Sequence, residues 1–197
     1  MKIPVPTWVI VVAASLGAGV AMSWGQTYAP DAIAPMFNSA APVVALAAGM
    51  ASLASSLRTS VLWGAAAGPL AMAGYYGMSA VRGFGVNSSF VLLWCVAGVL
   101  FGSVMGIAVW VINTRHDAWA GAAAGFWPGV ALGEAAHGRL RIAESTPVAY
   151  WLALAVLGAV VLYILLTFKT RGALARVAGL AATAVVAGAV YVVYGIV

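Results

Sequence analysis

The sequence predicts an all-α integral membrane protein, a compact bundle of about seven transmembrane helices whose N-terminus is cytoplasmic. Of its 197 residues, 64% are hydrophobic, and the mean hydropathy is +1.06. Only 7% are charged, against about 25% in a soluble domain. The same composition excludes a disordered chain, which is poor in hydrophobic residues. The apolar stretches are continuous rather than alternating, which excludes a membrane barrel of strands.

Seven apolar runs are long enough for membrane helices, each of which needs about 20 mostly apolar residues. They are 8–24, 40–57, 60–80, 88–113, 118–137, 148–168 and 174–195. Because the connections are short, we expect residues 1–197 to form a single helical-bundle domain of the cell membrane. Six spans remain the alternative if the sixth or seventh run is re-entrant. The first run lacks a small-residue cleavage site, which predicts a retained helix rather than a signal peptide.

The placement of Lys and Arg predicts the orientation, because cytoplasmic loops are enriched in both. A cytoplasmic N-terminus leaves three of these residues outside, namely Arg82, Arg139 and Arg141, and puts six inside, namely Lys2, Arg58, Arg115, Lys169, Arg171 and Arg176. We therefore expect the C-terminus to lie outside. The positive charges are scattered over short loops, so we expect a lipid bilayer and no nucleic acid as a partner. Protein partners cannot be inferred from the sequence.

The fifth run carries a row of glycines. Gly121, Gly125, Gly129 and Gly133 are four residues apart, and such rows let helix backbones approach closely in lipid. Pro128 in the same run should bend the helix, because proline removes a backbone donor and clashes one turn back.

Polar and aromatic residues gather in the outer half of the predicted bundle. We expect them to line a cavity for a hydrophobic small molecule, although Trp and Tyr also anchor helices at membrane faces. These substrate-binding candidates are Trp24, Gln26, Asn38, Tyr75, Tyr76, Asn87, Trp94, Trp127, Tyr150 and Trp151.

Glu134 lies inside an otherwise apolar span, where ionisable residues are costly and face a cavity or a partner. It is either a functional group or one half of a structural pair with His137, Arg139 or Arg141. Arg82 is expected to support the site electrostatically by pairing with Asp31 or Glu134, or else to contact lipid phosphates. His137 is a second candidate for electrostatic support.

The loop after the first span is the longest connection and contains two prolines. It is too apolar for a solvated linker, so we expect it to fold back over the outer mouth as a lid or half-helix. Asp31 either caps a short helix beginning at Ala32 or faces the cavity as an acid.

Several kinds of site are excluded. The single Cys95 rules out a disulfide framework or a Cys-based metal site. No His pair has ligand spacing, so neither zinc nor bis-His haem is expected. No intramembrane lysine can form a retinal Schiff base. We therefore expect no metal and no cofactor.

The remaining groups are suited to proton chemistry. Aromatic faces attract cations, and an apolar site keeps a carboxylic acid protonated until it acts. Such a site suits protonation of an alkene or epoxide and stabilisation of the carbocation. It suits binding of a nutrient without chemistry equally well.

Five short stretches carry a family resemblance. Trp24-Gly-Gln26, Pro30-Asp31 and the segment 37–42, together with 74–83 and Leu132-Gly-Glu134, resemble a small actinobacterial membrane family of similar length. Size and span number are also similar to the integral-membrane terpene cyclases of bacterial indole-sesquiterpenoid pathways. That resemblance implies an acid-initiated terpene cyclase with Asp31 and Glu134 as the catalytic acids. Whether the substrate is an alkene or an epoxide stays open.

A second resemblance points to the substrate-binding subunits of energy-coupling-factor vitamin transporters. These are similar in size and carry an Ala-x-x-x-Ala pattern in the first helix, which Ala14 and Ala18 match. The resemblance implies substrate binding near the outer face. A seventh span departs from the six-span pattern of that family.

Overall fold

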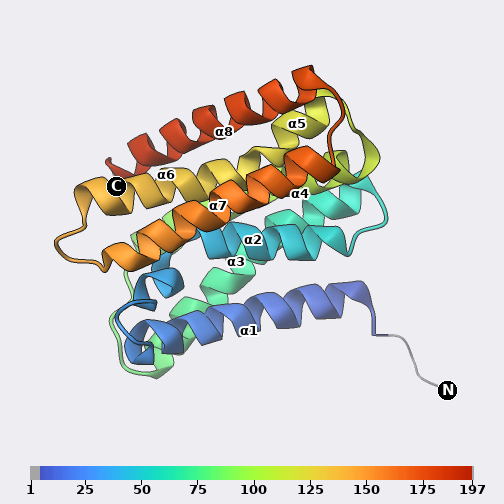
Figure 1. Ribbon diagram of the computed structural model, residues 1–197. Helices are drawn as coiled ribbons and strands as arrows, with labels where there is room; N and C mark the ends of the chain where they lie inside the picture. Colours follow the sequence, from blue (N-terminus) through green and yellow to red (C-terminus); the bar gives the residue numbers. More distant parts are fainter. Residues whose placement is uncertain (1–4, 197) are drawn as a thin grey trace. The chain divides into compact units, whose positions relative to one another are not determined.

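The structure, a computed structural model, describes residues 5–196 and is all-helical there, with 82% helix and no strand. The sequence-based prediction of a helical fold is confirmed. The elements follow one another along the chain as in Figure 1. They are α1 (Thr7–Tyr28), the 3-10 helix η1 (Ala34–Asn38), α2 (Ala40–Ser52), α3 (Leu57–Val81), α4 (Ser88–Thr114), α5 (Ala118–Ala124), α6 (Phe126–Arg141), α7 (Val148–Phe168) and α8 (Ala173–Tyr194).

Four helices are long and apolar enough to cross a membrane, namely α1, α4, α7 and α8. The third predicted span lies within the continuous helix α3, whereas the second and fifth differ from the prediction. The second run is helical only to Ser52, and the fifth is divided into α5 and α6.

The division between α5 and α6 lies in the turn before Pro128, the residue at which the sequence predicts a bend. Proline at this position has no N–H for the carbonyl of Ala124, and its ring clashes with that carbonyl. The helix accordingly ends at Ala124 and begins again at Phe126. Gly125 occupies the break, and its N–H bonds to the carbonyls of Gly121 and Ala122, both at 3.2 Å.

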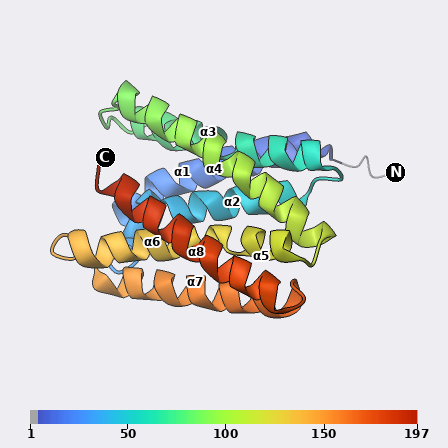
Figure 2. The same cartoon turned by 90° about the horizontal axis from the view of Figure 1, so that it is seen from above.

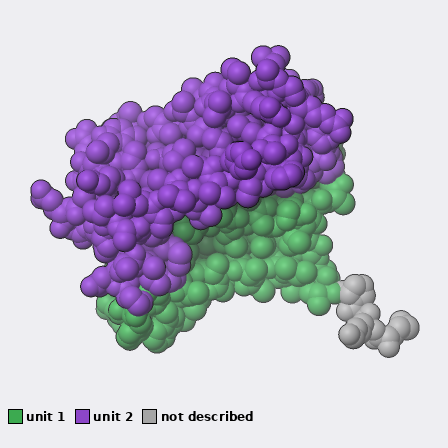
Figure 3. Space-filling view, in the orientation of Figure 1, with its two compact units in different colours: residues 1–29, 42–107 green, residues 30–41, 108–197 purple. Residues whose placement is uncertain are grey.

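The chain forms two compact units, coloured separately in Figure 3. Unit 1 comprises residues 1–29 and 42–107, and unit 2 comprises residues 30–41 and 108–197. In unit 1 a Cβ at Gly19 would meet the backbone of Ala71, and a Cβ at Gly74 would meet that of Leu16. Close approach of α1 and α3 therefore requires small residues on both helices.

A second close contact in unit 1 joins α3 and α4, and our sequence analysis missed it. Gly64 faces the backbone of Gly102, and Gly68 faces Gly98. One turn before Gly64, the Ser60 hydroxyl donates to the Gly106 carbonyl at 2.8 Å. Each helix thus carries a row of small residues four apart, the pattern that permits close backbone approach.

In unit 2 the predicted glycine row packs against α8. A Cβ at Gly121, Gly125 or Gly133 would meet backbone atoms of Ala175, Gly179 or Ala187, and one at Gly129 would meet Val186 and Thr183. The predicted role of this row in packing is confirmed. Helix α6 also packs against α7, and both views of the ribbon show these helices together (Figures 1 and 2).

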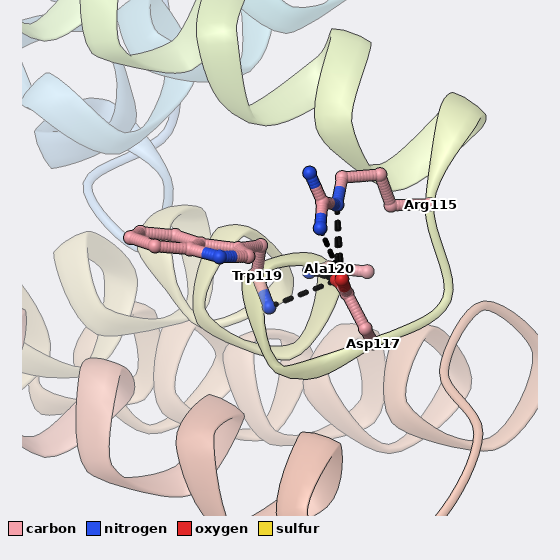
Figure 4. Close-up of polar contacts among 4 residues, drawn as sticks. All are labelled: Arg115, Asp117, Trp119 and Ala120. Carbon is pink, nitrogen blue, oxygen red and sulfur yellow. Dashed lines mark hydrogen bonds and ion pairs between the residues drawn. The ribbon is translucent and has the colours of Figure 1, made fainter.

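The start of α5 is fixed by Asp117 (Figure 4). Its carboxylate accepts from the backbone N–H groups of Trp119 and Ala120 at 3.1 and 3.4 Å, as a helix N-cap does. It also forms an ion pair with Arg115, whose Nε lies 3.2 and 3.0 Å from the two carboxylate oxygens. The Arg115 hydrogen bond, together with those from the backbone, lowers the pKa of Asp117 below its ordinary value.

Because of this ion pair, we expect a small part of the free energy of unfolding to depend on pH in the acid range. Because the pKa of Asp117 is lower in the folded protein, its contribution is complete above about pH 4 and is lost as the pH falls through the folded value. We expect Asp117→Asn, which keeps an N-cap oxygen, to flatten the decline of the thermal midpoint below about pH 4. The effect is small because the pair is exposed to solvent. Identical declines for the two proteins between neutral and acid pH would contradict it.

Candidate functional site

The Glu134 carboxylate is the most completely buried charged group that the structure describes, with only 2% of the residue exposed. Four donors surround it. The Ser39 hydroxyl and the Ala41 N–H donate to Oε2 at 2.7 and 2.9 Å. The Ala40 N–H and the Tyr194 hydroxyl donate to Oε1 at 2.8 and 2.7 Å. A carboxylate has about four acceptor positions, and here protein donors occupy them all.

The two amides belong to the first turn of α2, where backbone N–H groups have no partner within the helix. Ordinarily a side chain at the position of Ser39 would accept from these groups. Here Ser39 donates instead, and Glu134 from α6 caps the helix from 94 residues away. The positive end of the helix dipole also favours a carboxylate at this place.

Two tyrosines from different helices complete the arrangement. Tyr194 comes from the last turn of α8. Tyr150, in the first turn of α7, donates its hydroxyl to Ser39 Oγ at 2.8 Å. We call Glu134, Ser39, Tyr150, Tyr194 and the amides of Ala40 and Ala41 the Glu134 cluster, and all of it lies within unit 2.

The donors of the Glu134 cluster differ in what they can do. The amides of Ala40 and Ala41 only donate, and each bonds a different carboxylate oxygen. The hydroxyls of Ser39, Tyr150 and Tyr194 both donate and accept. A proton on Glu134 can therefore be passed to Ser39 or Tyr194 by reversing a hydroxyl, while both amide bonds stay in place.

His137 lies one turn beyond Glu134 on α6 and is also buried. Its ring centroid is 5.4 Å from that of Tyr194 and 6.1 Å from that of Tyr191. Its Nδ1 has no hydrogen-bond partner among the described residues. The buried imidazole of His137 and the rings of Tyr191 and Tyr194 therefore lie next to one another beside the Glu134 cluster.

Of the two alternatives for Glu134, the structural ion pair with a nearby basic side chain is wrong. In the part of the chain that the structure describes, Glu134 forms no ion pair with His137, Arg139 or Arg141. Arg141 instead donates from Nε to the Tyr191 hydroxyl at 2.9 Å and lies over that ring. The Glu134 carboxylate accepts hydrogen bonds from backbone amides and hydroxyl groups instead of from a basic side chain.

The expected cap by Asp31 is also wrong. Asp31 is exposed, and η1 begins only at Ala34, with Ile33 at the N-cap position and no side-chain cap. Asn38, the last residue of η1, is exposed as well. The loop does contain a short helix, but among the described residues no hydrogen bond joins Asp31 to Glu134.

Two other predicted residues of unit 2 lie at or near the Glu134 cluster. Trp127 donates from Nε1 to the Ala41 carbonyl at 2.9 Å, so it holds the same turn of α2. Trp151 packs edge-on against Tyr150, with ring centroids 4.7 Å apart. Its Nε1 donates to the Thr146 hydroxyl at 2.8 Å.

Five of the predicted residues of unit 1 lie near the ends of α1 and α3. The Tyr75 hydroxyl donates to Gln26 Oε1, and the Tyr75 and Tyr76 rings meet edge to face at 5.0 Å. The Arg82 guanidinium lies over the Trp24 ring at 4.4 Å. Its hydrogen-bond partner within the unit is Ser23.

Asn87 and Trp94 lie at the beginning of α4. Asn87 Oδ1 accepts from the Ser89 N–H at 2.9 Å, which makes Asn87 the cap of that helix. Trp94 is half-buried. Ala14 and Ala18, the pair behind the transporter alternative, are half-buried beside the small-residue face of α1, and that alternative stays a prediction.

Sequence reasoning missed Ser39 and Tyr194. A serine directly before an apolar run is a recognised helix-start signal, so Ser39 was available as a cap of α2. Nothing in the sequence links Tyr194 to Glu134, because the two are 60 residues apart on different helices.

Comparison with known proteins places the chain in a family but gives it no characterised relative. No curated protein matches it. No solved structure matches it either. A family model does match, over residues 1–197. The chain therefore belongs to the family of unknown function DUF6518.

Proposed function

We propose that the chain is a multi-pass protein of the cell membrane that cyclises a prenylated, hydrophobic substrate by proton transfer from the Glu134 cluster. The observation that carries this proposal is the contact of a fully buried carboxyl group with two hydroxyls that can reverse their hydrogen bonds. Buried ionisable groups in membrane helices are costly and mark functional sites. Resemblance to membrane terpene cyclases supplies the substrate class.

Proton transfer in this scheme begins with the carboxylic acid form of Glu134, in which the carboxyl group donates to the Tyr194 hydroxyl and so reverses the hydrogen bond described above. Because the amides of Ala40 and Ala41 bond both carboxyl oxygens, the proton reaches substrate through Tyr194, which is half-buried. Tyr194 gives its hydroxyl proton to an alkene carbon or an epoxide oxygen and takes the Glu134 proton in return. The alkene π bond or the epoxide C–O bond breaks, and a carbocation remains.

Ring closure then uses only the electrons of the substrate. A second alkene donates its π pair to the cation and forms the new C–C bond. The last cation loses a proton, which returns to the Glu134 carboxylate through Tyr194 or Ser39. Substrate and product have the same mass, and no co-reactant is consumed.

Asp31 is less suited to this role than Glu134. Its carboxyl group is exposed, whereas an acid that handles a carbocation needs a site from which water is excluded. Asp31 therefore serves as the control carboxyl in the experiments below.

Insertion in the membrane is supported by the four long apolar helices and by the helical form of the other three predicted spans. In the proposed topology the N-terminus is cytoplasmic and the C-terminus is outside. Lys2, one of the six inside charges, lies outside the described residues. Resistance to alkaline extraction, with a C-terminal tag accessible from outside intact cells, tests this topology.

The activity is tested with the purified protein in lipid nanodiscs and a panel of prenylated indoles, both linear and terminally epoxidised. We expect a product of unchanged mass and altered retention time. Tyr194→Phe should lower the turnover rate by about 10²–10⁴-fold, the usual contribution of a positioned acid. The lost hydrogen bond should cost only about 1–2 kcal/mol of stability.

Tyr191→Phe is the matched control, because Tyr191 is one turn earlier on α8 and bonds Arg141 instead of Glu134. It should keep its activity, as should Asp31→Asn. A folded Tyr194→Phe protein with full turnover would overturn the proposed proton path. Failure of the wild-type protein to bind or convert any member of the panel would overturn the cyclase itself.

A further inference from the structure

We propose that Arg82 and the aromatic rings around it bind the phosphate group of an anionic membrane lipid. This site lies wholly within unit 1. The inference rests on the proposed insertion in the membrane and is independent of the cyclase activity.

Three aromatic rings surround the guanidinium group of Arg82. Its Cζ lies 4.4 Å from the centroid of the Trp24 ring, 4.9 Å from Phe84 and 5.3 Å from Tyr28. Trp24 and Tyr28, one turn apart on α1, are stacked at 5.3 Å. Cation–π contacts of this kind fix a guanidinium in place without consuming its N–H donors.

The turn after α3 brings Phe84 to this position. Gly83 has φ of +81°, a left-handed conformation that glycine adopts without strain. The Gly83 N–H bonds to the Ala80 carbonyl and the Phe84 N–H to the Ser79 carbonyl, both at 3.0 Å. These two bonds form a Schellman motif, which ends α3 and turns the chain back.

Within unit 1, one nitrogen of the guanidinium is occupied. Nη1 donates to the carbonyl and to the hydroxyl of Ser23. Nε and Nη2 have no hydrogen-bond partner among the described residues of unit 1, and the sequence of unit 1 contains no Asp or Glu. Within its unit, Arg82 therefore presents three N–H donors and a charge that no carboxylate balances, and guanidinium binds phosphate oxygens in a bidentate manner.

The surroundings favour a lipid over a soluble anion. The site lies at the C-terminal ends of α1 and α3, and α1 is long and apolar enough to cross a membrane. The rings around Arg82 remain exposed, at 45% for Trp24, 70% for Tyr28 and 51% for Phe84. Exposed aromatic residues at the end of an apolar helix are typical of the level of lipid headgroups. The acyl chains of a lipid whose phosphate binds Arg82 would cover the exposed rings of Trp24, Tyr28 and Phe84.

Lipid binding is tested by native mass spectrometry of the detergent-solubilised protein, titrated with phosphatidylglycerol or phosphatidylcholine. We expect preference for phosphatidylglycerol, and a Kd about tenfold weaker in Arg82→Gln. Arg58→Gln is the matched control, because it removes the same charge from the exposed first turn of the same helix. It should leave the Kd within about twofold.

A second variant, Phe84→Leu, keeps the guanidinium and its bonds to Ser23. It should weaken lipid binding about two- to threefold without lowering the thermal midpoint. The proposal therefore remains testable even if Arg82→Gln misfolds. Equal lipid affinity in the wild-type, Arg82→Gln and Phe84→Leu proteins would overturn the inference. Displacement of the lipid by millimolar inorganic phosphate would assign the site to a soluble anion instead.

The outcomes separate this inference from the proposed function. If the protein does not float with lipid vesicles, membrane insertion fails and both proposals fall. If it inserts and cyclises substrate but Arg82 does not affect lipid binding, only the lipid site is wrong.

Discussion

Glu134→Gln should destabilise the protein by about 3 kcal/mol, although the two side chains have the same shape. The amides of Ala40 and Ala41 bond different carboxylate oxygens, and neither amide can act as an acceptor. A glutamine has one oxygen and one NH2 group, so whichever way it is placed, an NH2 group faces a backbone N–H. One buried hydrogen bond is lost, and one amide at the start of α2 is left without a partner. Chemical denaturation of the detergent-solubilised protein measures the change.

Glu144→Gln is the control for Glu134→Gln. Glu144 is exposed in the loop between α6 and α7, and its substitution should change stability by less than about 0.5 kcal/mol. An equally small effect at Glu134 would mean that the carboxylate does not hold the start of α2. The same instability makes Glu134→Gln a poor probe of catalysis on its own, which is why Tyr194→Phe carries the test of the proton path.

Gly133→Ala should destabilise the packing of α6 on α8 by about 1–3 kcal/mol. The added Cβ would lie 2.5 Å from the carbonyl oxygen of Ala187 and 2.9 Å from both its Cα and the Cβ of Val190. Two of these three atoms belong to the backbone, so the helices must move apart to relieve the contact. The midpoint of thermal unfolding in detergent should fall accordingly.

Gly188→Ala is the matched control on the partner helix. A Cβ at Gly188 would meet nothing within 4 Å, and alanine is about 1 kcal/mol more favourable than glycine in a helix. We therefore expect its midpoint to stay the same or rise. If both substitutions raised the midpoint, close approach of α6 and α8 would not be needed for stability.

The parts of the fold that depend on local sequence could be predicted. Continuous apolar runs identified the helices, Pro128 indicated an irregularity near the break between α5 and α6, and the spacing of Gly121 to Gly133 identified a packing face. Each of these features acts within one helix turn or along one helix face. The row on α3 and α4 had the same spacing, and a systematic search for small residues four apart would have found it.

The Glu134 cluster could be predicted only in part. An ionisable residue in an apolar span indicated that a partner exists, but its partners were chosen from the nearby basic side chains. The structure instead satisfies the carboxylate with the start of α2 and with Tyr194, groups that hydropathy and charge patterns do not reveal. An uncapped helix start is a positively polarised site, and recognition of that property at Ser39 would have offered it as a partner.

The position of Tyr194 has a consequence for the order in which the protein can be completed during synthesis. The amides that open α2 are synthesised well before their acceptor, because Glu134 follows 94 residues after Ala40, and Tyr194 follows another 60 residues after Glu134. Until Glu134 has been synthesised, the first turn of α2 lacks the acceptor that it has in the folded protein. The last turn of α8 therefore completes the hydrogen bonding at the start of a much earlier helix, and a nascent chain that stops before α8 leaves Glu134 without one of its four donors.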